Sequence, residues 1–212
     1  MTYFYLHGFA SSPRSAKAVY LSDRFEALGL NLQVPNLNQE DFFNLTLTRQ
    51  IHQVQAAFPP PPDPVTLIGS SLGGLVAAWV AQQQTQVQRL ILLAPAFEFL
   101  SRWLPKLGQS QVQSWQSQGQ LAVYHYGEQR SLQLSYQFVL DAQQYPDNQL
   151  QRPVPTLIMH GLQDDVIPVQ VSHEFAAQRP WVRLMELESD HSLSNVTGKL
   201  WDAIQEFCQL GQ

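Results

Sequence analysis

The sequence of 212 residues contains one cysteine, Cys208, so an internal disulfide bond is excluded. The near absence of cysteine is typical of proteins in a reducing compartment, and we expect a cytoplasmic location. The thiol is expected to act as a small buried apolar group. The N-terminus has no basic segment followed by an apolar stretch and a small-residue cleavage site, so we expect no leader to be removed.

Long apolar runs and clusters of positive charge are also missing. No stretch of about 18 apolar residues occurs, so we expect no membrane-spanning helix. The net charge is -5, and because Lys and Arg do not gather into runs, we expect no nucleic-acid partner. A length of 212 residues with 44% hydrophobic content is enough for one packed core, and a second would be hard to fit, which predicts a single domain over residues 1–212.

Short runs of β-branched or aromatic residues alternate with longer amphipathic segments. This alternation predicts an α/β fold, with a mostly parallel central sheet and helices on both of its faces. The expected strands are Tyr3–Leu6, Asn31–Pro35, Val65–Ile68, Arg89–Leu93, Thr156–Met159 and Val182–Leu187. The expected helices are Ser15–Leu28, Phe42–Phe58, Leu72–Gln83, Val169–Gln178 and Lys199–Leu210.

The alternation lapses between residues 97 and 152, the least regular section of the chain, which predicts a lid-like or cap-like insertion after a sheet strand. A hairpin is expected from Leu121 to Leu134, with its turn near Gly127 and Glu128. The apolar residues at the start of the insertion either line an acyl pocket or form its own small core. These residues are Phe97, Phe99, Leu100, Trp103, Leu104 and Leu107.

The segment Gly69-Ser70-Ser71-Leu72-Gly73 lies between a predicted strand and a predicted Ala-rich helix. A serine on such a sharp strand-to-helix turn is held with a strained backbone and an exposed hydroxyl. Gly69 and Gly73 permit close approaches that a Cβ would block. We therefore predict that Ser71 is a nucleophile.

Three motifs together resemble the α/β-hydrolase superfamily: the Ser71 turn, the segment His160-Gly161-Leu162-Gln163-Asp164-Asp165-Val166-Ile167-Pro168, and Ser189-Asp190-His191-Ser192. The opening Tyr5-Leu6-His7-Gly8-Phe9-Ala10-Ser11-Ser12-Pro13 is similar to the start of the small bacterial YqiA-like esterases. The resemblance spans the chain. It implies an α/β-hydrolase fold and a serine hydrolase that acts on small-molecule esters or thioesters without a metal or cofactor.

His191 follows the last predicted strand and completes the Ser, acid, His order of this fold, so we expect it to be the general base. The superfamily pattern places the catalytic carboxylate on Asp164, with Ile167 in place of the usual Val. Asp165 is the alternative acid, whereas Asp190 is adjacent to the base and poorly placed to hold its ring. The remaining histidines are expected to brace loops (His7 and His160, in turns after strands) or to serve as surface or packing residues (His52, His125 and His173).

The reaction also needs an oxyanion hole. One donor is expected to be the backbone N–H of Leu72 at the start of the helix, and the other the N–H of Phe9, next to Gly8. Other functions remain open at this point: a non-catalytic binding or scaffold protein of the same fold, or a lipase, peptidase or C–C bond hydrolase. A metal hydrolase using His160, Asp164, Asp165 and His191 lacks an ordinary ligand spacing.

Overall fold

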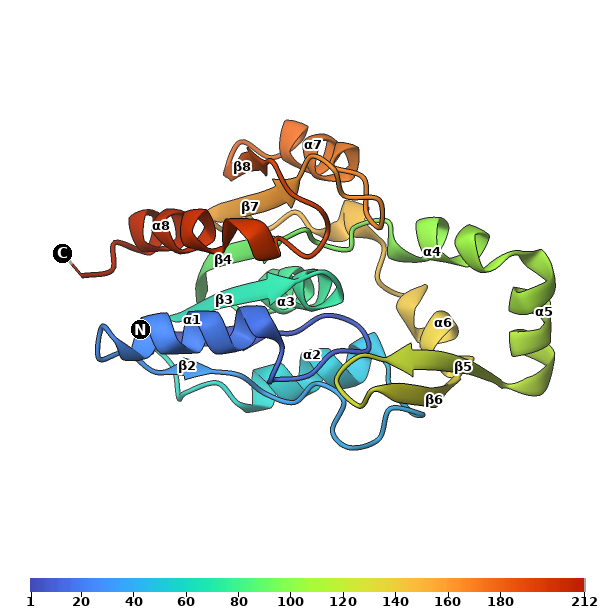
Figure 1. Cartoon of the computed structure of the whole chain (residues 1–212). Coiled ribbons are helices and arrows are strands. Elements are labelled where there is room, and N and C mark those ends of the chain that lie inside the picture. The colour runs from blue at the N-terminus through green and yellow to red at the C-terminus, as the bar shows by residue number, and fades with distance from the viewer. Residues whose placement is uncertain (212) are drawn as a thin grey trace.

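The β-branched and aromatic runs pair into one parallel sheet at the centre of the molecule (Figure 1). The computed structural model describes residues 1–211. The strands of the sheet are β1 (Thr2–Leu6), β2 (Leu32–Gln33), β3 (Val65–Ser70), β4 (Val87–Leu93), β7 (Thr156–Gly161) and β8 (Val182–Leu187). Their order is β2-β1-β3-β4-β7-β8, and every neighbouring pair is parallel. This is the mostly parallel sheet that the sequence predicts.

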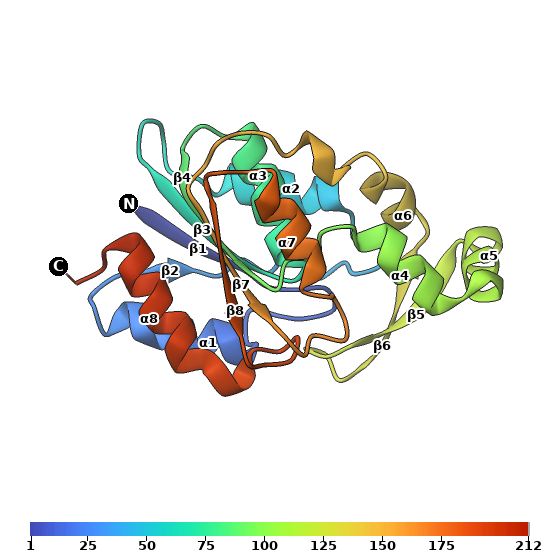
Figure 2. The same cartoon turned by 90° about the horizontal axis from the view of Figure 1, so that it is seen from above.

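Helices cover both faces of this sheet, as Figure 2 shows. On one face lie α1 (Ala16–Glu26) and α8 (Thr197–Cys208), the latter preceded by the short 3-10 helix η2 (Ser194–Val196). On the other face lie α2 (Leu47–Ala56), α3 (Leu72–Gln83) and α7 (Gln170–Ala177). The alternation of β1 explains both layers, because Tyr3 and Tyr5 join one apolar core while Phe4 and Leu6 join the other.

The segment between β4 and β7 projects beyond the carboxyl ends of the strands (Figure 1). We call residues 97–152 the cap. The cap contains α4 (Phe99–Leu107), α5 (Gln109–Gln118), β5 (Gln120–His125), β6 (Arg130–Ser135), α6 (Gln137–Ala142) and the 3-10 helix η1 (Asp147–Gln149). The predicted hairpin is confirmed as the antiparallel pair β5–β6. The sequence pattern predicted none of the three α-helices that form here.

Three further details differ from the sequence-based prediction. Helix α2 begins at Leu47 and not at Phe42, because the side chain of Thr46 accepts a hydrogen bond from the amide of Arg49 and caps the helix there. Strand β2 is only two residues long at the edge of the sheet. His160 lies within β7, paired with Glu186, and not in a turn after the strand.

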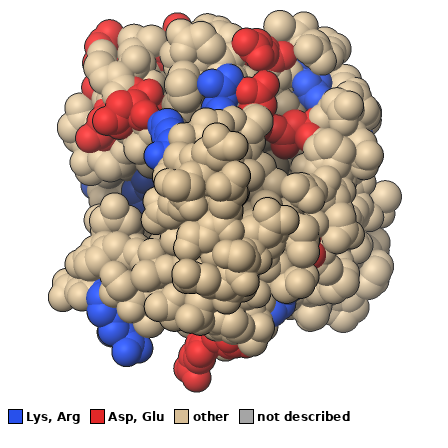
Figure 3. Space-filling model, turned by 90° about the vertical axis from the view of Figure 1, so that its right-hand side faces the viewer, with Lys and Arg blue, Asp and Glu red and all other residues tan. Residues whose placement is uncertain are grey.

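Within residues 1–211, no helix has the length and apolar character needed to cross a membrane. The side of the molecule formed by the cap carries few charged groups. Figure 3 shows Lys, Arg, Asp and Glu near the upper and lower edges of that side and an uncharged centre. Helix α5, with the sequence QSQVQSWQSQ, has no charged residue.

Candidate active site

Ser71 occupies the sharp turn between β3 and α3. Its backbone has φ 54° and ψ −121°, a conformation that L-residues rarely adopt. Two hydrogen bonds fix it in place: the Ser71 amide donates to the carbonyl of Leu93 (2.9 Å), and the Ser71 carbonyl accepts from the amide of Ala96 (3.0 Å). The end of the neighbouring strand β4 thus holds the turn, and these hydrogen bonds stabilise the strained conformation of Ser71.

Backbone segments from three loops meet closely around Ser71. A Cβ on Gly8 would lie 3.3 Å from the Cβ of Ser71, so the loop after β1 passes directly beside the serine. A Cβ on Gly161 would overlap the carbonyl oxygen of Ser189, which brings the loop before α8 against the end of β7. These approaches place the ends of β1, β3, β7 and β8 around one point.

The side chains of Ser71, His191 and Asp164 form a continuous hydrogen-bonded row. Nε2 of His191 lies 3.1 Å from Oγ of Ser71, and Nδ1 of His191 lies 2.7 Å from Oδ2 of Asp164. The Asp164 carboxylate is fully buried, whereas the His191 side chain is 24% exposed. The structure therefore brings the predicted nucleophile, base and acid together across 120 residues of sequence.

The Asp164 carboxylate accepts four hydrogen bonds. Oδ1 accepts from the amides of Val166 (3.0 Å) and Ile167 (2.7 Å), and Oδ2 faces both His191 and His160. Burial alone would raise the pKa of Asp164, but the hydrogen bonds from His160, His191 and the Ile167 amide outweigh it and hold the pKa below its usual range. The group is therefore ionised at neutral pH.

The two alternative acids lie elsewhere. Asp165 is exposed, and its backbone carbonyl accepts a hydrogen bond from Nζ of Lys106. Asp190 is also exposed, and its Oδ1 accepts hydrogen bonds from the amide and hydroxyl of Ser192. Neither carboxylate faces the ring of His191 among the hydrogen bonds formed by residues 1–211.

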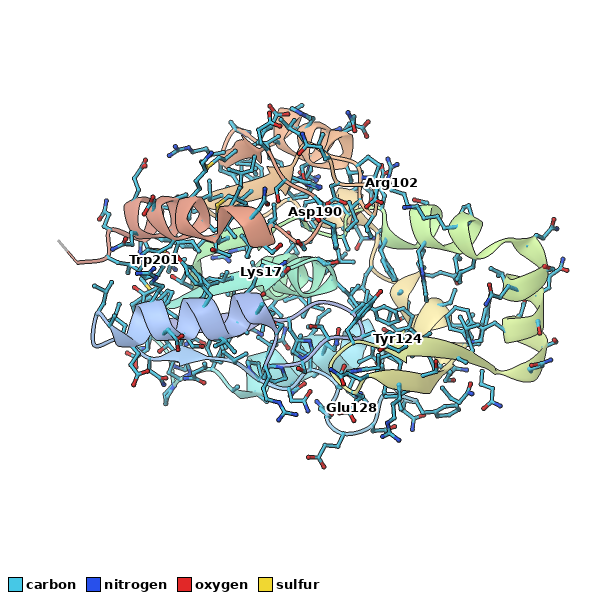
Figure 4. All side chains as sticks on the ribbon, in the orientation of Figure 1. Lys17, Arg102, Tyr124, Glu128, Asp190 and Trp201 are labelled. Atoms are coloured by element: carbon cyan, nitrogen blue, oxygen red, sulfur yellow. The ribbon has the colours of Figure 1, made fainter. Side chains whose placement is uncertain are left out.

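A lysine from α1 supports the loop that carries His191. Nζ of Lys17 donates to the carbonyl of Ser192 at 2.6 Å, and Figure 4 shows Lys17 where α1 faces the loop with Asp190. Burial lowers the pKa of Lys17 to about 8, against the opposing effect of the charges of Asp190 and Asp164. The role of Lys17 could not be predicted from the sequence, because no local pattern connects a helix position to a loop 175 residues away.

The amides of Phe9 and Leu72 belong to the two backbone segments that lie next to Ser71. Leu72 is the first residue of α3, where the helix leaves its N–H groups free of internal partners. Phe9 follows Gly8 in the loop after β1. Neither amide donates a hydrogen bond to a group in the part of the chain that the structure describes. Two unengaged donors at a helix N-terminus and a nearby loop suit an anion.

A cavity of about 560 Å³ opens above Ser71 and His191. Most of its wall comes from the cap, including Phe99, Trp103 and Leu107 of α4. Phe97 also lines it, whereas Leu100 and Leu104 pack against the apolar core. Some of the apolar residues at the start of the insertion therefore line the cavity, and others contribute to the core.

The mouth of the cavity combines aromatic and cationic side chains. Tyr124 and Tyr126 are exposed and meet edge to face, with ring centroids 5.3 Å apart. Arg102 and Lys106 lie one turn apart on α4, and Figure 4 shows Arg102 at the base of this helix. Arg102 pairs with Glu98 at 2.6 Å, and Nζ of Lys106 donates to the carbonyls of Asp165 and Val166. The cap is thereby attached to the loop that carries Asp164.

A larger cavity of about 730 Å³ lies on the far side of the loop after β1, between that loop, residues 36–43 and the β5–β6 hairpin. It is lined by mixed charges, including Arg14, Arg130 and Glu128, and contains none of the three residues described above. Its volume therefore does not identify it as the reactive site. The cavity above Ser71 is smaller but is lined by Ser71 and His191.

The other histidines have separate environments. Nε2 of His7 accepts the amide of Leu37 at 3.0 Å, so its Nδ1 carries the proton and donates to the carbonyl of Gly8. Burial lowers the pKa of His7, and the ring remains neutral as it braces the loop. His125 is buried beside Asn38, whereas His52 is exposed and His173 pairs with Glu186.

Within residues 1–211, no group of three or more His, Cys, Asp and Glu side chains is arranged to hold a metal ion.

Solved structures with the same fold extend over nearly the whole chain. Alpha/beta hydrolase domain-containing protein 10 from mouse is 19% identical, with a TM-score of 0.77 over 98% of this chain and 89% of that one. Est1E from Butyrivibrio proteoclasticus, with ferulic acid bound, is 18% identical, with a TM-score of 0.79 over 97% and 87%. Monoacylglycerol lipase from Paleococcus ferrophilus is 14% identical, with a TM-score of 0.73 over 96% and 92%. At these identities the similarity shows the α/β-hydrolase fold.

Sequence comparison adds the family. No curated protein matches the sequence. The sequence pattern of an uncharacterised protein family, UPF0227, matches residues 2–208, which confirms the resemblance to the YqiA-like proteins. The chain therefore belongs to the UPF0227 family, and its fold is that of the α/β-hydrolases.

Proposed function

We propose that this protein is a serine hydrolase that cleaves carboxylic esters or thioesters through an acyl-enzyme intermediate. One observation carries the proposal: Ser71, His191 and the buried Asp164 are joined by hydrogen bonds of 3.1 and 2.7 Å beside an apolar cavity. A packing role would not require a strained serine, a partly exposed imidazole and a buried carboxylate in one row.

The first half of the reaction acylates the serine. Nε2 of His191 takes the proton of the Ser71 hydroxyl as Oγ attacks the carbonyl carbon of the substrate. Negative charge then develops on the former carbonyl oxygen, which the amides of Phe9 and Leu72 would stabilise. The imidazolium of His191, held by Asp164, returns its proton to the departing alcohol or thiol.

The second half reverses these roles with water. His191 takes a proton from a water molecule, the resulting oxygen attacks the acyl carbon, and the bond to Ser71 Oγ breaks. The carboxylic acid leaves and the serine regains its proton. Asp164 stays ionised throughout, because its hydrogen bonds favour the charged form. No metal or cofactor is needed for any of these proton transfers.

The cavity favours an apolar group on the substrate. Its wall is largely aromatic and aliphatic, with Trp103 packed against Phe9 and Phe99 at centroid distances of 5.3 and 5.1 Å. Burial of an apolar chain against this wall gains about 0.8 kcal/mol for each methylene group. Est1E, with ferulic acid bound, and the monoacylglycerol lipase share the fold, and their names support an ester substrate.

A fluorophosphonate probe tests the proposal without requiring a known substrate. Wild-type protein and Ser71→Ala are incubated with the probe, and their intact masses are recorded. We expect one adduct on the wild type and none on the variant, together with ester hydrolysis that is insensitive to a chelator. A wild type that takes no adduct and hydrolyses no ester or thioester would instead favour a non-catalytic binding protein.

A further inference from the structure

A second imidazole contacts the carboxylate of Asp164. Nε2 of His160 lies 3.1 Å from Oδ2, the same oxygen that faces Nδ1 of His191 at 2.7 Å. His160 is fully buried in β7, and both side chains of this contact have no exposed surface. The histidine therefore approaches the carboxylate from the protein interior, whereas His191 approaches it from the cavity.

The neighbours of His160 define its proton. Nε2 also lies 2.8 Å from the carbonyl of Ile167, which only accepts hydrogen bonds, so Nε2 carries the hydrogen. Nδ1 lies 2.7 Å from the hydroxyl of Ser172 on α7, which is also fully buried. This hydroxyl has no other hydrogen-bond partner within residues 1–211. Both ring nitrogens of His160 are thus engaged.

The same arrangement fixes both oxygens of Asp164. Oδ1 is held by the amides of Val166 and Ile167, and without His160 the only side chain on Oδ2 among residues 1–211 would be His191. In the proposed reaction Nδ1 of His191 needs Oδ2 in one fixed place, and a second donor on that oxygen limits rotation of the carboxylate. A buried histidine in a strand costs desolvation that an apolar residue would avoid, and the contacts of its Nε2 are with Asp164 and with Ile167 of the same loop.

We propose that His160 is a positioning residue for the reaction. Its Nε2–H group holds Oδ2 of Asp164 toward His191 and stabilises part of the negative charge on that oxygen. Ser172 holds the ring of His160 in turn. The inference rests on the proposed function, because it assigns a role within the same site. It extends the hydrogen-bonded row inward from Ser71 to α7.

Loss of the Nε2–H donor has two separable consequences. The carboxylate gains freedom to rotate, which misaligns His191 and lowers kcat with little effect on KM. The charge on Oδ2 is no longer shared, so the protonated form of His191 gains stability and the acid limb of kcat/KM moves to higher pH. A residue that only fills space would not produce the second change.

Two substitutions at one position provide the test. In His160→Gln, the side-chain nitrogen reaches the place of Nε2 and can donate to Asp164, whereas in His160→Asn it reaches only the place of Nδ1. Hydrolysis of a neutral ester is measured for both variants and the wild type between about pH 5 and 9. Circular dichroism and thermal unfolding establish that each variant is folded.

We expect kcat of His160→Asn to fall about 10- to 100-fold with its acid limb at higher pH, and His160→Gln to lie closer to the wild type in both respects. A folded His160→Asn with wild-type kcat and an unchanged acid limb overturns the role, as does a Gln variant as impaired as the Asn variant. If His160→Asn does not fold, Ser172→Ala provides the test. This variant should move the acid limb of kcat/KM to higher pH by a smaller amount. An unshifted limb in Ser172→Ala then overturns the proposal, whereas an inactive, unlabelled wild type would refute the proposed function itself.

Discussion

The α-carbon of Gly69, in β3, lies so close to the carbonyl oxygen of Gly73, in α3, that a side chain on Gly69 would overlap it. A Cβ on Gly73 would in turn overlap the carbonyl of Leu6 at the end of β1. The two glycines therefore let α3 begin directly behind Ser71 and let β1 pass beside it. The position of the serine depends on contacts between backbones, which cannot shift as a flexible side chain can.

Substitution of either glycine is expected to destabilise the protein strongly. Gly69→Ala and Gly73→Ala should each lower the free energy of unfolding by about 3 kcal/mol or more, because the added methyl group meets backbone. Urea unfolding measures the loss. Gly198→Ala in α8 is the control, because its surroundings are open and alanine favours a helix by about 0.5–1 kcal/mol. Equal unfolding midpoints for Gly73→Ala and Gly198→Ala would contradict the close packing.

The proposed role of Asp164 as the catalytic carboxylate can be tested with two adjacent residues. Asp164→Asn should lower kcat about 10³-fold or more, because an amide neither stabilises the imidazolium of His191 nor enforces its working tautomer. Asp165→Asn, an exposed neighbour, should keep nearly full activity. Steady-state ester hydrolysis with both variants decides, and an inactive Asp165→Asn beside an active Asp164→Asn would move the role by one residue.

The sequence predicted the sheet and its helices because their periodicity is local. Strands such as β8 and helices such as α3 were predicted with their observed bounds, since apolar spacing and the flanking turns define them within a few residues. The start of α2 was predicted too early, because the apolar Phe42 fits the spacing of a helix face in the sequence. In the structure Phe42 precedes the helix and packs against Phe9 and His125. Tertiary packing, not helix formation, places that residue.

The candidate site was predictable where its residues lie in local sequence motifs that occur in a fixed order. Ser71 lies in a local turn pattern, and His191 and Asp164 come from motifs whose order the fold requires. The contacts of His160 with Ser172 and of Lys17 with Ser192 join residues 12 and 175 positions apart. Nothing in the spacing distinguishes such pairs from other buried or surface side chains, so they emerge only with the fold.

The cap is expected to control which acyl groups enter the cavity. Trp103→Ala removes a ring from the wall above Ser71, so kcat/KM for a bulky branched or aryl ester should rise about tenfold relative to a short-chain ester. Because Trp103 is only partly buried, the loss of stability should stay below the roughly 3–5 kcal/mol that removal of a fully buried Trp causes.

A tryptophan on the opposite face of the sheet provides the control for this change. Trp201 of α8 packs against Phe25, away from the cavity (Figure 4). Trp201→Ala should destabilise the protein without changing the ratio of kcat/KM values for the two esters. If both variants alter that ratio equally, the effect comes from general loosening of the structure, and the cap does not select the acyl group.

The attachment of the cap contains a carboxyl group whose ionisation depends on folding. Oδ2 of Asp147 accepts the amide of Glu98 at the start of α4, at 2.5 Å. Burial raises the pKa of Asp147 from 3.8 to about 6, an effect that the Glu98 amide and Arg179 oppose and that the charge of Glu98 reinforces. The folded protein therefore binds a proton between these values that the unfolded chain does not.

The sign of the resulting pH dependence follows from this difference. Stability from Asp147 is fully present below about pH 4 and is lost as the pH rises through about 6, because the ionised form is disfavoured in the folded state. In Asp147→Asn this titration is absent. The free energy of unfolding of the wild type minus that of the variant should therefore decrease from about pH 4 to 6 and then become constant. Urea unfolding of both proteins across this range measures the difference, in which the contributions of Asp164 and other groups cancel. A difference that stays constant, or that increases with pH, would mean that Asp147 does not titrate at the start of α4 with a raised pKa.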